Sequence, residues 1–439
     1  MTRDEFETLA AALLARCGPD EVLLCYLRAE TSDFVRFNHN RVRQAGSVEQ
    51  RRLQITLVRD ERQAAAGLEL AGDPARDLAQ CEQLLRTLRQ QIRHLPRDPH
   101  LHYNTMPENT EETHAGDLPD AADMMQAIRR AAAGMDLVGI LSRGSQFRGF
   151  ANSLGQRNWH QAESWNLDWS CHHHADKAIK HGLAGFRWDA ARLAREMERV
   201  RAQLDVMGRP PVTIEPGDYR VYLAPAAVQE LLDLVGWGGF ALKAHRTAQT
   251  PLIKMITEDR RLHPAVTLGE DNRRGLAPRF TAEGFVKPDK VDLIEGGRYR
   301  DCLADARSAR EYGVKVNADS GCPGALDMQG GKLEEDEVLA QLGTGVYVSN
   351  LWYCNFSDRN DCRITGMTRF GTLWVEHGRP KAPLEPMRFD DSVYNLLGDA
   401  LEDLAREPLL MVDPGTYGER STASARLPGA LISNMRFTL

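Results

Sequence analysis

The sequence predicts an α+β fold in two domains, and three observations lead to this prediction. The chain has 439 residues, which is more than a single hydrophobic core normally supports. Helical and strand patterns are mixed along the chain and do not alternate regularly as βα units do. A stretch with three prolines, MGRPPVTIEPG at 207–217, marks the predicted domain boundary. We therefore predict an N-terminal mixed α/β domain at 1–206. A C-terminal β-rich domain, antiparallel and barrel-like with short helices, is predicted at 217–439.

The first half is expected to hold long helices and several strands. Residues 5–16 place Phe6, Leu9, Ala10, Leu13 and Leu14 on one helical stripe. Further helices are predicted at 74–93, 118–133 and 188–205. Strands are predicted at 21–27, 53–57, 136–142, 146–151 and 158–170, with a turn at 60–61. The stretch 94–117 is rich in Pro, His, Asn and Glu and is expected to form a long surface loop.

The second half is predicted to begin with a strand at 219–223 and a helix at 226–234. Short helices are expected at 303–312 and 334–342. The run 345–380 has the pattern of a strand, a polar loop, a strand and a tight turn. Its loop at 355–363 is densely charged, and charged loops held between apolar strands commonly carry binding groups.

Composition excludes several classes of protein. The net charge of −7 argues against non-specific binding of nucleic acid, which needs a basic surface. No apolar run approaches the length of a membrane span, and the acidic first helical turn is unlike a signal peptide. The eight cysteines are scattered without a C-x-x-C pair, which favours free thiols. A cytoplasmic protein is therefore expected.

Several short motifs occur in a fixed order along the chain. They are the strand pair at 51–67, NSLG at 152–155, LIEGGRY at 293–299, SAREYGV at 308–314, and the YVS, TGM and WVEHG segments within 345–380. Each motif alone is of modest specificity, but five or six in the correct order are hard to obtain by chance. Together they resemble the TldD/PmbA family over most of the chain.

One helix decides which branch of that family the chain resembles. In metal-bearing members this helix carries H-E-x-x-x-H, in which two histidines bind zinc and the Glu activates water. Residues 228–240 keep the frame but place Leu232, Asp233 and Trp237 at the His, Glu and His positions. The family's cysteine ligand, in a G-x-C-G turn, corresponds to Tyr417. Because leucine and tryptophan donate no lone pair, the resemblance is to the metal-free, TldE-like branch.

The resemblance implies a non-catalytic, metal-free subunit that is inactive alone. It would pair with a metal-bearing TldD-like subunit of a zinc peptidase complex and help to bind unfolded or partly processed peptides. No cofactor is expected in this chain, and zinc is expected only in the partner. An extended peptide would add to the strand at 346–353. The candidate peptide-binding residues are Val348, Asn350, Tyr353, Asn355, Asp358, Arg359, Arg363 and Arg369.

Two alternatives remain open at this point. The chain could be a homodimeric, non-enzymatic scaffold or regulator, since part of the family carries the name modulator of DNA gyrase. It could also be an independent thiol hydrolase that uses Cys354, because Arg359 and Arg363 could lower the pKa of a nearby cysteine. The sequence does not decide whether the partner is a TldD-like chain or a second copy.

Two further clusters contain metal-ligating residue types. Cys171, His172, His173 and His174 are consecutive, with His181 nearby, but neighbouring side chains on a strand alternate faces. Cys354 and Cys362, with Asp358 and Asp361, lack the compact knuckle of a structural zinc site. We favour a polar strand end for the first cluster and polar loop chemistry for the second, and metal binding by either stays open.

Overall fold

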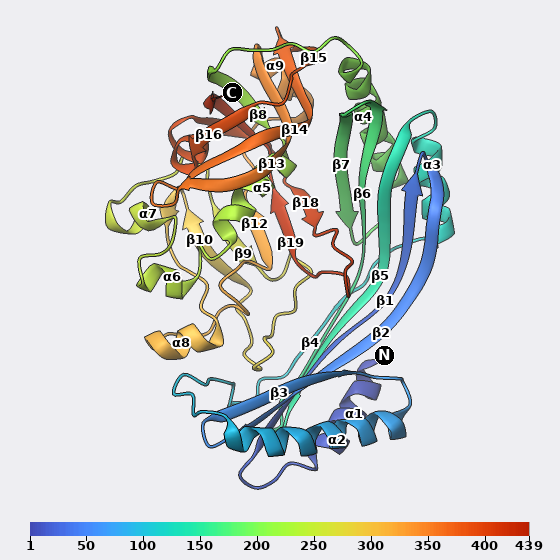
Figure 1. Cartoon of the computed structure of the whole chain (residues 1–439), viewed down its shortest axis with the longest axis vertical. Helices are drawn as coiled ribbons and strands as arrows, with labels where there is room; N and C mark the ends of the chain where they lie inside the picture. The colour runs from blue at the N-terminus through green and yellow to red at the C-terminus, as the bar shows by residue number, and fades with distance from the viewer. Residues whose placement is uncertain (439) are drawn as a thin grey trace.

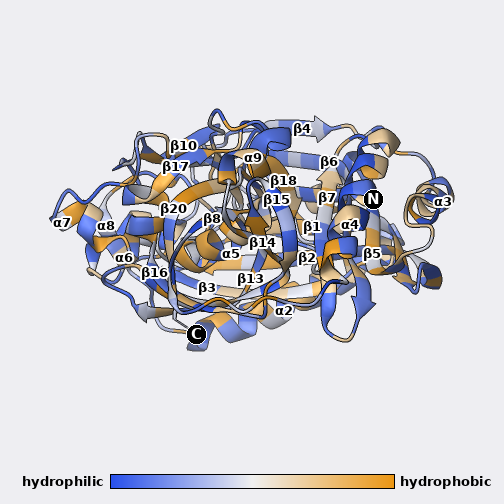
Figure 2. Cartoon of the chain, turned by 90° about the horizontal axis from the view of Figure 1, so that it is seen from above, coloured by the Kyte–Doolittle hydropathy of each residue, from blue (hydrophilic) through white to orange (hydrophobic). Residues whose placement is uncertain are grey.

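The structure, a computed structural model, describes residues 1–438 and confirms the mixed α+β fold. Three β-sheets form the framework, and helices pack on their faces and ends (Figure 1). None of the helices in residues 1–438 is both long and apolar enough to cross a membrane. Hydrophobic residues gather on the inner strands of the second half, whereas outer helices such as α2 mix hydrophilic and hydrophobic residues (Figure 2).

The first sheet is built on four long, curved strands, β1, β2, β5 and β6, beside which the shorter β3, β4 and β7 lie (Figure 1). Its order is β3-β2-β1-β5-β6-β4, and β7 pairs with the same strand, β6, as β4 does. The turn between its second and third strands has Asp60 and Glu61 at positive φ, as the sequence suggests. The strands are β1 Val22–Asn38, β2 Arg41–Arg59, β3 Arg62–Glu69, β4 Thr110–His114, β5 Asp136–Asn152, β6 Arg157–His174 and β7 Lys177–Gly185.

Two pairs of helices cover opposite ends of this sheet. Helices α1 (Arg3–Leu14) and α2 (Pro74–Gln91) share a core with the start of β1, and a 3-10 turn at Ile92–His94 follows α2. Helices α3 (Ala121–Ala131) and α4 (Ala190–Met207) share another core with β5, β6 and β7. The α4 seam of Leu193, Met197, Val200 and Leu204 is buried, as its helical spacing predicts.

The second half contains two sheets. One has the order β11-β10-β9-β12-β19-β18, and the other β13-β8-β20-β16-β14-β15, with β17 paired to β20 and β13 also paired to β14. The first comprises β9 Leu268–Asp271, β10 Lys290–Glu295, β11 Arg298–Tyr299, β12 Ala325–Met328, β18 Leu409–Val412 and β19 Ser424–Leu427. The second comprises β8 Gly217–Leu223, β13 Gly345–Asp358, β14 Arg363–Glu376, β15 Arg379–Pro383, β16 Arg388–Ser392, β17 Leu401–Leu404 and β20 Ala430–Phe437.

The barrel-like description of this half is wrong in detail. The second of these sheets curls, but only the single pair Phe389 and Phe437 joins β16 to β20, so closure is incomplete. The helices of this half are α5 Pro225–Gly236, α6 Leu242–Arg246, α7 Ile253–Thr257, α8 Ala306–Tyr312 and α9 Val338–Leu342, with a 3-10 turn at Glu335–Glu337 and a π-helical turn at Asn395–Asp399.

The two halves pack closely against each other. The strands of the first sheet lie within residues 22–185 and those of the other two within 217–437. Leu373 belongs to the core cluster of α3 and α4, and Leu409 packs against it. The domain boundary at 207–217 therefore stays a prediction.

A C-terminal segment, residues 413–423, crosses from β18 to the first sheet. Within it, Arg420 is 3% exposed, and its backbone N lies 3.4 Å from both carboxylate oxygens of Glu30 on β1. Its guanidinium donates to the Gly144 carbonyl at 3.1 Å and to the Ser164 hydroxyl at 2.9 Å. This segment, which we call the C-terminal strap, thus fixes the second half to the first.

Four differences from the sequence-based elements matter for the site. The predicted loop at 94–117 contains β4, and β7 is a strand that was not predicted. The two strands predicted at 136–142 and 146–151 form one continuous β5. The predicted polar loop at 355–363 is mostly strand, because β13 and β14 continue pairing as far as Asp358 and Arg363. Polar residues can form strands there because the end of this hairpin is solvent-exposed.

Candidate functional site

A cavity of about 1210 Å³ lies between the two halves, and we call it the central cavity. One part of its wall comes from β7 and α4 of the first half. The other part comes from α5, β13 and β18 of the second half. The volume is that of a pocket able to hold a small ligand or a short peptide segment.

Helix α5 presents two chemically different faces. It begins at Pro225, which suits a first helical turn, and ends before Gly238, which adopts φ 83°. The face packed on the core consists of Ala227, Val228, Leu231, Leu232 and Val235. The other face consists of Gln229, Glu230, Asp233 and Trp237, which line the cavity. The polar face of this helix therefore forms one wall of the central cavity.

The acidic groups of this wall have perturbed pKa values. Asp233 is exposed to the cavity but enclosed by its walls, and this desolvation, together with Glu230 and Asp413, raises the pKa of Asp233 to about 6. Desolvation also raises the pKa of Glu230, and Lys180 opposes that change. Carboxylates that are desolvated together in a cavity are typical of binding sites.

The first-half wall is mainly basic. It carries Lys180 and His181 on β7, and Arg192, Arg195 and Arg199 on α4. Some of these groups are already paired: Glu196 lies 3.4 Å from His181 and 3.2 Å from Arg199, and Lys180 lies 3.5 Å from Asp168. Arg192 and Arg195 have no ion-pair partner within residues 1–438. The cavity therefore offers free cations on one half and carboxylates on the other.

The residues at the degenerate metal positions do not fit a zinc ion. Leu232 is 3% exposed and belongs to the core, whereas Trp237 is 75% exposed and faces the cavity. Of the three helix positions, only Asp233 offers a metal-ligating atom. Tyr417 lies on the C-terminal strap, is fully exposed and is absent from the cavity wall. The structure brings three of the four positions together on α5 and leaves Tyr417 apart.

The candidate peptide-binding residues occupy two different places. Val348 is fully buried, and the segment around it is paired on one side with β8 and on the other with β14, so its side chain is unavailable. Asn350 lines the central cavity, and its side-chain oxygen accepts a hydrogen bond from the Ser349 hydroxyl at 2.9 Å. After Val348, β13 pairs only with β14 among residues 1–438, so its other edge is no longer paired with β8.

The other candidates lie along the β13–β14 hairpin, outside the cavity lining. Tyr353 is 81% exposed and adopts φ 59°, at a bulge in the pairing of the two strands. Arg369 lies over the rings of Trp352 and Phe370, 5.4 Å from each centroid. Asn355 is exposed and pairs with Thr365. These residues form an exposed aromatic surface on the hairpin.

At the end of the hairpin the charged residues are engaged within the protein. The Asp358 carboxylate accepts a hydrogen bond from the backbone N of Asn360 at 2.9 Å. Arg359 donates to the Gln249 carbonyl at 3.0 Å and lies over the Phe356 ring. Arg363 forms an ion pair with Asp390 at 2.5 Å. These side chains hold the hairpin in place.

The two hairpin thiols are not activated. Burial raises the pKa of both Cys354 and Cys362 to about 12, and the opposing charge of Arg359 on Cys362 is too weak to reverse this. The sequence-based expectation of a lowered thiol pKa is therefore wrong, because Arg363 pairs with Asp390 and desolvation dominates.

The residues around Cys171 do not converge on one point. Cys171 is buried, whereas His173 and His174 are exposed with their Nδ1 atoms 2.6 Å apart, His172 is also exposed, and His181 faces Glu196. Within residues 1–438, one group of three possible metal ligands lies close together: Glu112, His114 and His160. Sequence reasoning missed this group because β4 was taken as loop. The available signal was the T-E-E-T-H run, which sets a Glu and a His two residues apart.

Comparison with known proteins points to one family. Residues 216–439 match the family described as PmbA/TldA metallopeptidase C-terminal domain. No curated protein matches the chain. TldE from Thermococcus kodakarensis superposes with a TM-score of 0.76 at 16% identity, over 99% of this chain and 100% of that chain.

Two further solved structures have the same architecture. A candidate modulator of a DNA gyrase from Thermotoga maritima MSB8 has a TM-score of 0.74 at 14% identity, over 99% of this chain and 100% of that one. A candidate modulator of DNA gyrase from Bacteroides thetaiotaomicron VPI-5482 has a TM-score of 0.75 at 16% identity, over 100% of both chains. At such low identities these similarities show the fold alone.

Proposed function

The chain belongs to the PmbA/TldD family of metallopeptidase-like proteins, and from this premise we propose that it is a metal-free subunit of a zinc peptidase complex. In this role it hydrolyses nothing itself. It holds an unfolded or partly processed peptide in the central cavity for a metal-bearing TldD-like partner. One observation carries the proposal: α5 turns Asp233 and Trp237, two of the three positions that match the zinc motif of the metal-bearing branch, toward the cavity.

The chemistry of the cavity supports peptide as the ligand class. A peptide carries alternating donors and acceptors, and its termini have opposite charges. Glu230 and Asp233 suit an ammonium group, whereas Arg192 and Arg195 suit carboxylate or carbonyl oxygens. The exposed indole of Trp237 adds an apolar surface to the same cavity wall. Past Val348, the open edge of β13 leaves backbone groups that an extended chain could pair with.

The direct test uses the chain alone and mixed with a metal-bearing TldD-like chain encoded in the same genome. A fluorescently labelled disordered peptide reports binding by anisotropy and cleavage by mass spectrometry. We expect binding by the chain alone and cleavage only in the mixture. Asp233→Asn and Trp237→Ala should weaken binding and slow the mixed reaction, without changing the zinc content of the partner. Equal cleavage by the partner in the absence of this chain would contradict the proposal.

A homodimeric scaffold is the second candidate function. The exposed aromatic surface of the hairpin supports it, since Trp352 is 48% exposed and Tyr353 is 81% exposed. Solution mass by sedimentation, with and without the TldD-like chain, separates the two proposals. A stable homodimer that binds no peptide and supports no cleavage favours the scaffold. The thiol-hydrolase alternative is disfavoured, because the raised pKa of Cys354 keeps its thiol protonated at neutral pH.

A further inference from the structure

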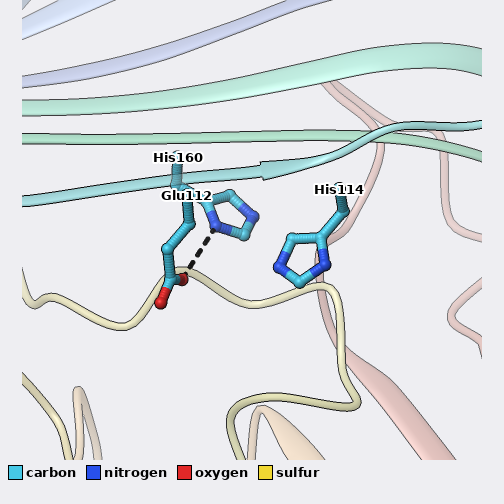
Figure 3. Close-up of side chains that lie close together, drawn as sticks. All are labelled: Glu112, His114 and His160. Carbon is cyan, nitrogen blue, oxygen red and sulfur yellow. Dashed lines mark ion pairs between the residues drawn. The ribbon is translucent and has the colours of Figure 1, made fainter.

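Two histidines and a glutamate gather where the first sheet meets the second half, away from the central cavity (Figure 3). Strand β4 runs parallel to β6, and the register sets Glu112 directly beside His160. His114 follows Glu112 by two residues, so both side chains leave β4 on the same face. One ligand atom from each of the three residues lies within 4.8 Å of the other two.

The hydrogen bonding of His160 leaves one ring nitrogen as a free acceptor. The residue is 1% exposed, and its Nε2 lies 3.0 Å from the Leu276 carbonyl oxygen. Because a carbonyl only accepts, Nε2 must carry the hydrogen. In the neutral ring Nδ1 therefore presents a lone pair. Nδ1 is buried and has no hydrogen-bond partner within residues 1–438. A buried polar atom without a partner needs an explanation.

The carboxylate of Glu112 does not supply that partner. Its Oε2 lies 3.7 Å from His160 Nδ1, which is too long for a hydrogen bond even if the ring were protonated. Its Oε1 accepts a hydrogen bond from Arg279 at 2.9 Å, and Arg279 also pairs with Asp289 at 2.8 Å. The guanidinium of Arg279 thus holds Oε1 of Glu112, and Oε2 is the oxygen that approaches His160.

His114 completes the arrangement. Its ring centroid lies 5.4 Å from that of His160, and it stacks on Phe186 at 5.9 Å. Two imidazoles and one carboxylate are a donor set that binds zinc and similar divalent ions in proteins.

We propose that Glu112, His114 and His160 bind one divalent transition-metal ion, with Zn²⁺ as the best match to their donor atoms. Ligand atoms around tetrahedral zinc lie about 3.3 Å apart, given bonds of roughly 2.0 Å. The 3.7 Å between Glu112 and His160 is already close to this spacing, so side-chain rotation suffices. The hydrogen bonds from His160 to Leu276 and from Arg279 to Glu112 would orient the two ligands.

The position of the site suggests what the ion does. His160 and Glu112 belong to the first sheet, whereas Leu276 and Arg279 belong to the second half. A metal bound here would stabilise the contact between the halves and would take no part in peptide hydrolysis. The inference is independent of the function proposed above, because no residue of the central cavity is involved.

The test is a titration of the full chain after removal of metal with a chelator. Zn²⁺ is followed by calorimetry, and Co²⁺ by its visible absorption, which reports tetrahedral nitrogen and oxygen ligation. We expect one ion per chain. His114→Gln and Glu112→Gln should each lower the affinity for Zn²⁺ by at least about 100-fold. Loss of a residue that only supports a ligand costs up to about 100-fold, so loss of a ligand itself should cost more. Circular dichroism checks that the variants are folded.

A matched control removes other histidines. His173 and His174 are exposed neighbours whose Nδ1 atoms lie 2.6 Å apart, so they could bind a metal ion adventitiously. The double variant His173→Gln, His174→Gln should keep the tight site. Zn²⁺ should also raise the Tm of the wild-type chain but not that of His114→Gln. The proposal is overturned if no saturable binding occurs, or if binding survives His114→Gln and disappears in the control.

Discussion

Glu230 and Asp233 lie three residues apart on α5, and both carboxyl groups line the same cavity. Their mutual repulsion, added to desolvation, leaves Asp233 with a pKa of about 6. In the folded protein this group therefore changes charge close to physiological pH. Two measurable consequences follow, one for stability and one for binding.

Asp233→Asn should stabilise the protein at neutral pH. In the folded state the pKa of Asp233 is about 6, whereas the ordinary pKa of an aspartate is 3.8. Between pH 3.8 and 6 the unfolded chain therefore ionises this group more readily, and its ionisation favours unfolding. Stability contributed by this group is present at low pH and is lost as pH rises to 6. Because the group is exposed to the cavity, we expect a gain of only about 1 kcal/mol at pH 7. Thermal unfolding between pH 4 and 7 measures it.

The control for this stability change is Asp205→Asn, at an exposed aspartate of α4 without an ion pair in residues 1–438. Its effect should stay within about 0.5 kcal/mol at every pH. Identical pH profiles for the wild-type chain and Asp233→Asn would contradict the assignment of a raised pKa to Asp233.

Peptide binding should strengthen as pH rises through about 6, since an ionised Asp233 attracts the ammonium end of a peptide. Anisotropy titrations between pH 5 and 7.5 measure this dependence. Asp233→Asn should bind the peptide weakly at every pH, with the affinity that the wild-type chain shows at low pH. A peptide with an acetylated N-terminus should show the same weak binding with the wild-type chain. Binding that weakens as pH rises would show that Asp233 is not the ammonium-binding group.

Trp237→Ala should reduce peptide affinity and leave stability nearly unchanged. The indole is 75% exposed, so removing it costs little packing, but it loses the apolar wall offered to a ligand. We expect a loss of about 1–2 kcal/mol in binding, or roughly 5- to 30-fold. Trp352→Ala on the hairpin is the matched control, because it removes an exposed indole outside the cavity. Equal losses of peptide affinity in the two variants would show that the peptide also contacts the hairpin, contrary to the proposal.

Arg420→Met should destabilise the contact between the C-terminal strap and the first sheet. The variant removes the guanidinium that donates to the Gly144 carbonyl and the Ser164 hydroxyl, and losing hydrogen bonds from a buried charged group costs about 2–3 kcal/mol. Urea denaturation and limited proteolysis of residues 413–423 report the loss. Arg28→Gln is the control, since it removes a partly exposed ion pair of 3.2 Å with Glu419 and should cost less than about 1 kcal/mol. Similar midpoints for the two variants would refute the role given to Arg420.

Cysteine labelling distinguishes buried thiols from reactive ones. Cys322 is exposed and should react first with a maleimide at pH 7.5. Cys354 and Cys362 should react far more slowly, because burial raises the pKa of each to about 12. Peptide mapping by mass spectrometry gives the order. Fast labelling of Cys354 would restore the thiol-hydrolase alternative.

The sequence predicts elements well where apolar spacing is strong. The stripe of α1 and the seam of α4 lie close to their expected bounds. Strand β4 could not be recognised, because TEETH contains no apolar residue and forms only by pairing with β6. Strand β7 contains alanine and glycine, which favour strands weakly. In both cases tertiary pairing decides the structure.

The candidate site could be predicted only in part. The residues around Leu232 and Trp237, which match the family's zinc-binding helix, allowed α5 to be identified from the sequence. The basic wall on α4 could not be foreseen, because Arg192 and Arg195 reach the cavity only through the packing of the two halves. The same holds for Glu112 and His160, which are neighbours solely through the register of β4 on β6. Contacts between distant segments have no local pattern.

The buried position of Arg420 also limits how a ligand can enter. Spreading the two halves like a hinge would require pulling a guanidinium out of a dry site, away from the Gly144 carbonyl and the Ser164 hydroxyl. Such an opening is slow and costly compared with side-chain motion. We therefore expect the width of the central cavity to change little. If the cavity holds a peptide, as we propose, an unfolded chain would enter it more readily than a folded domain.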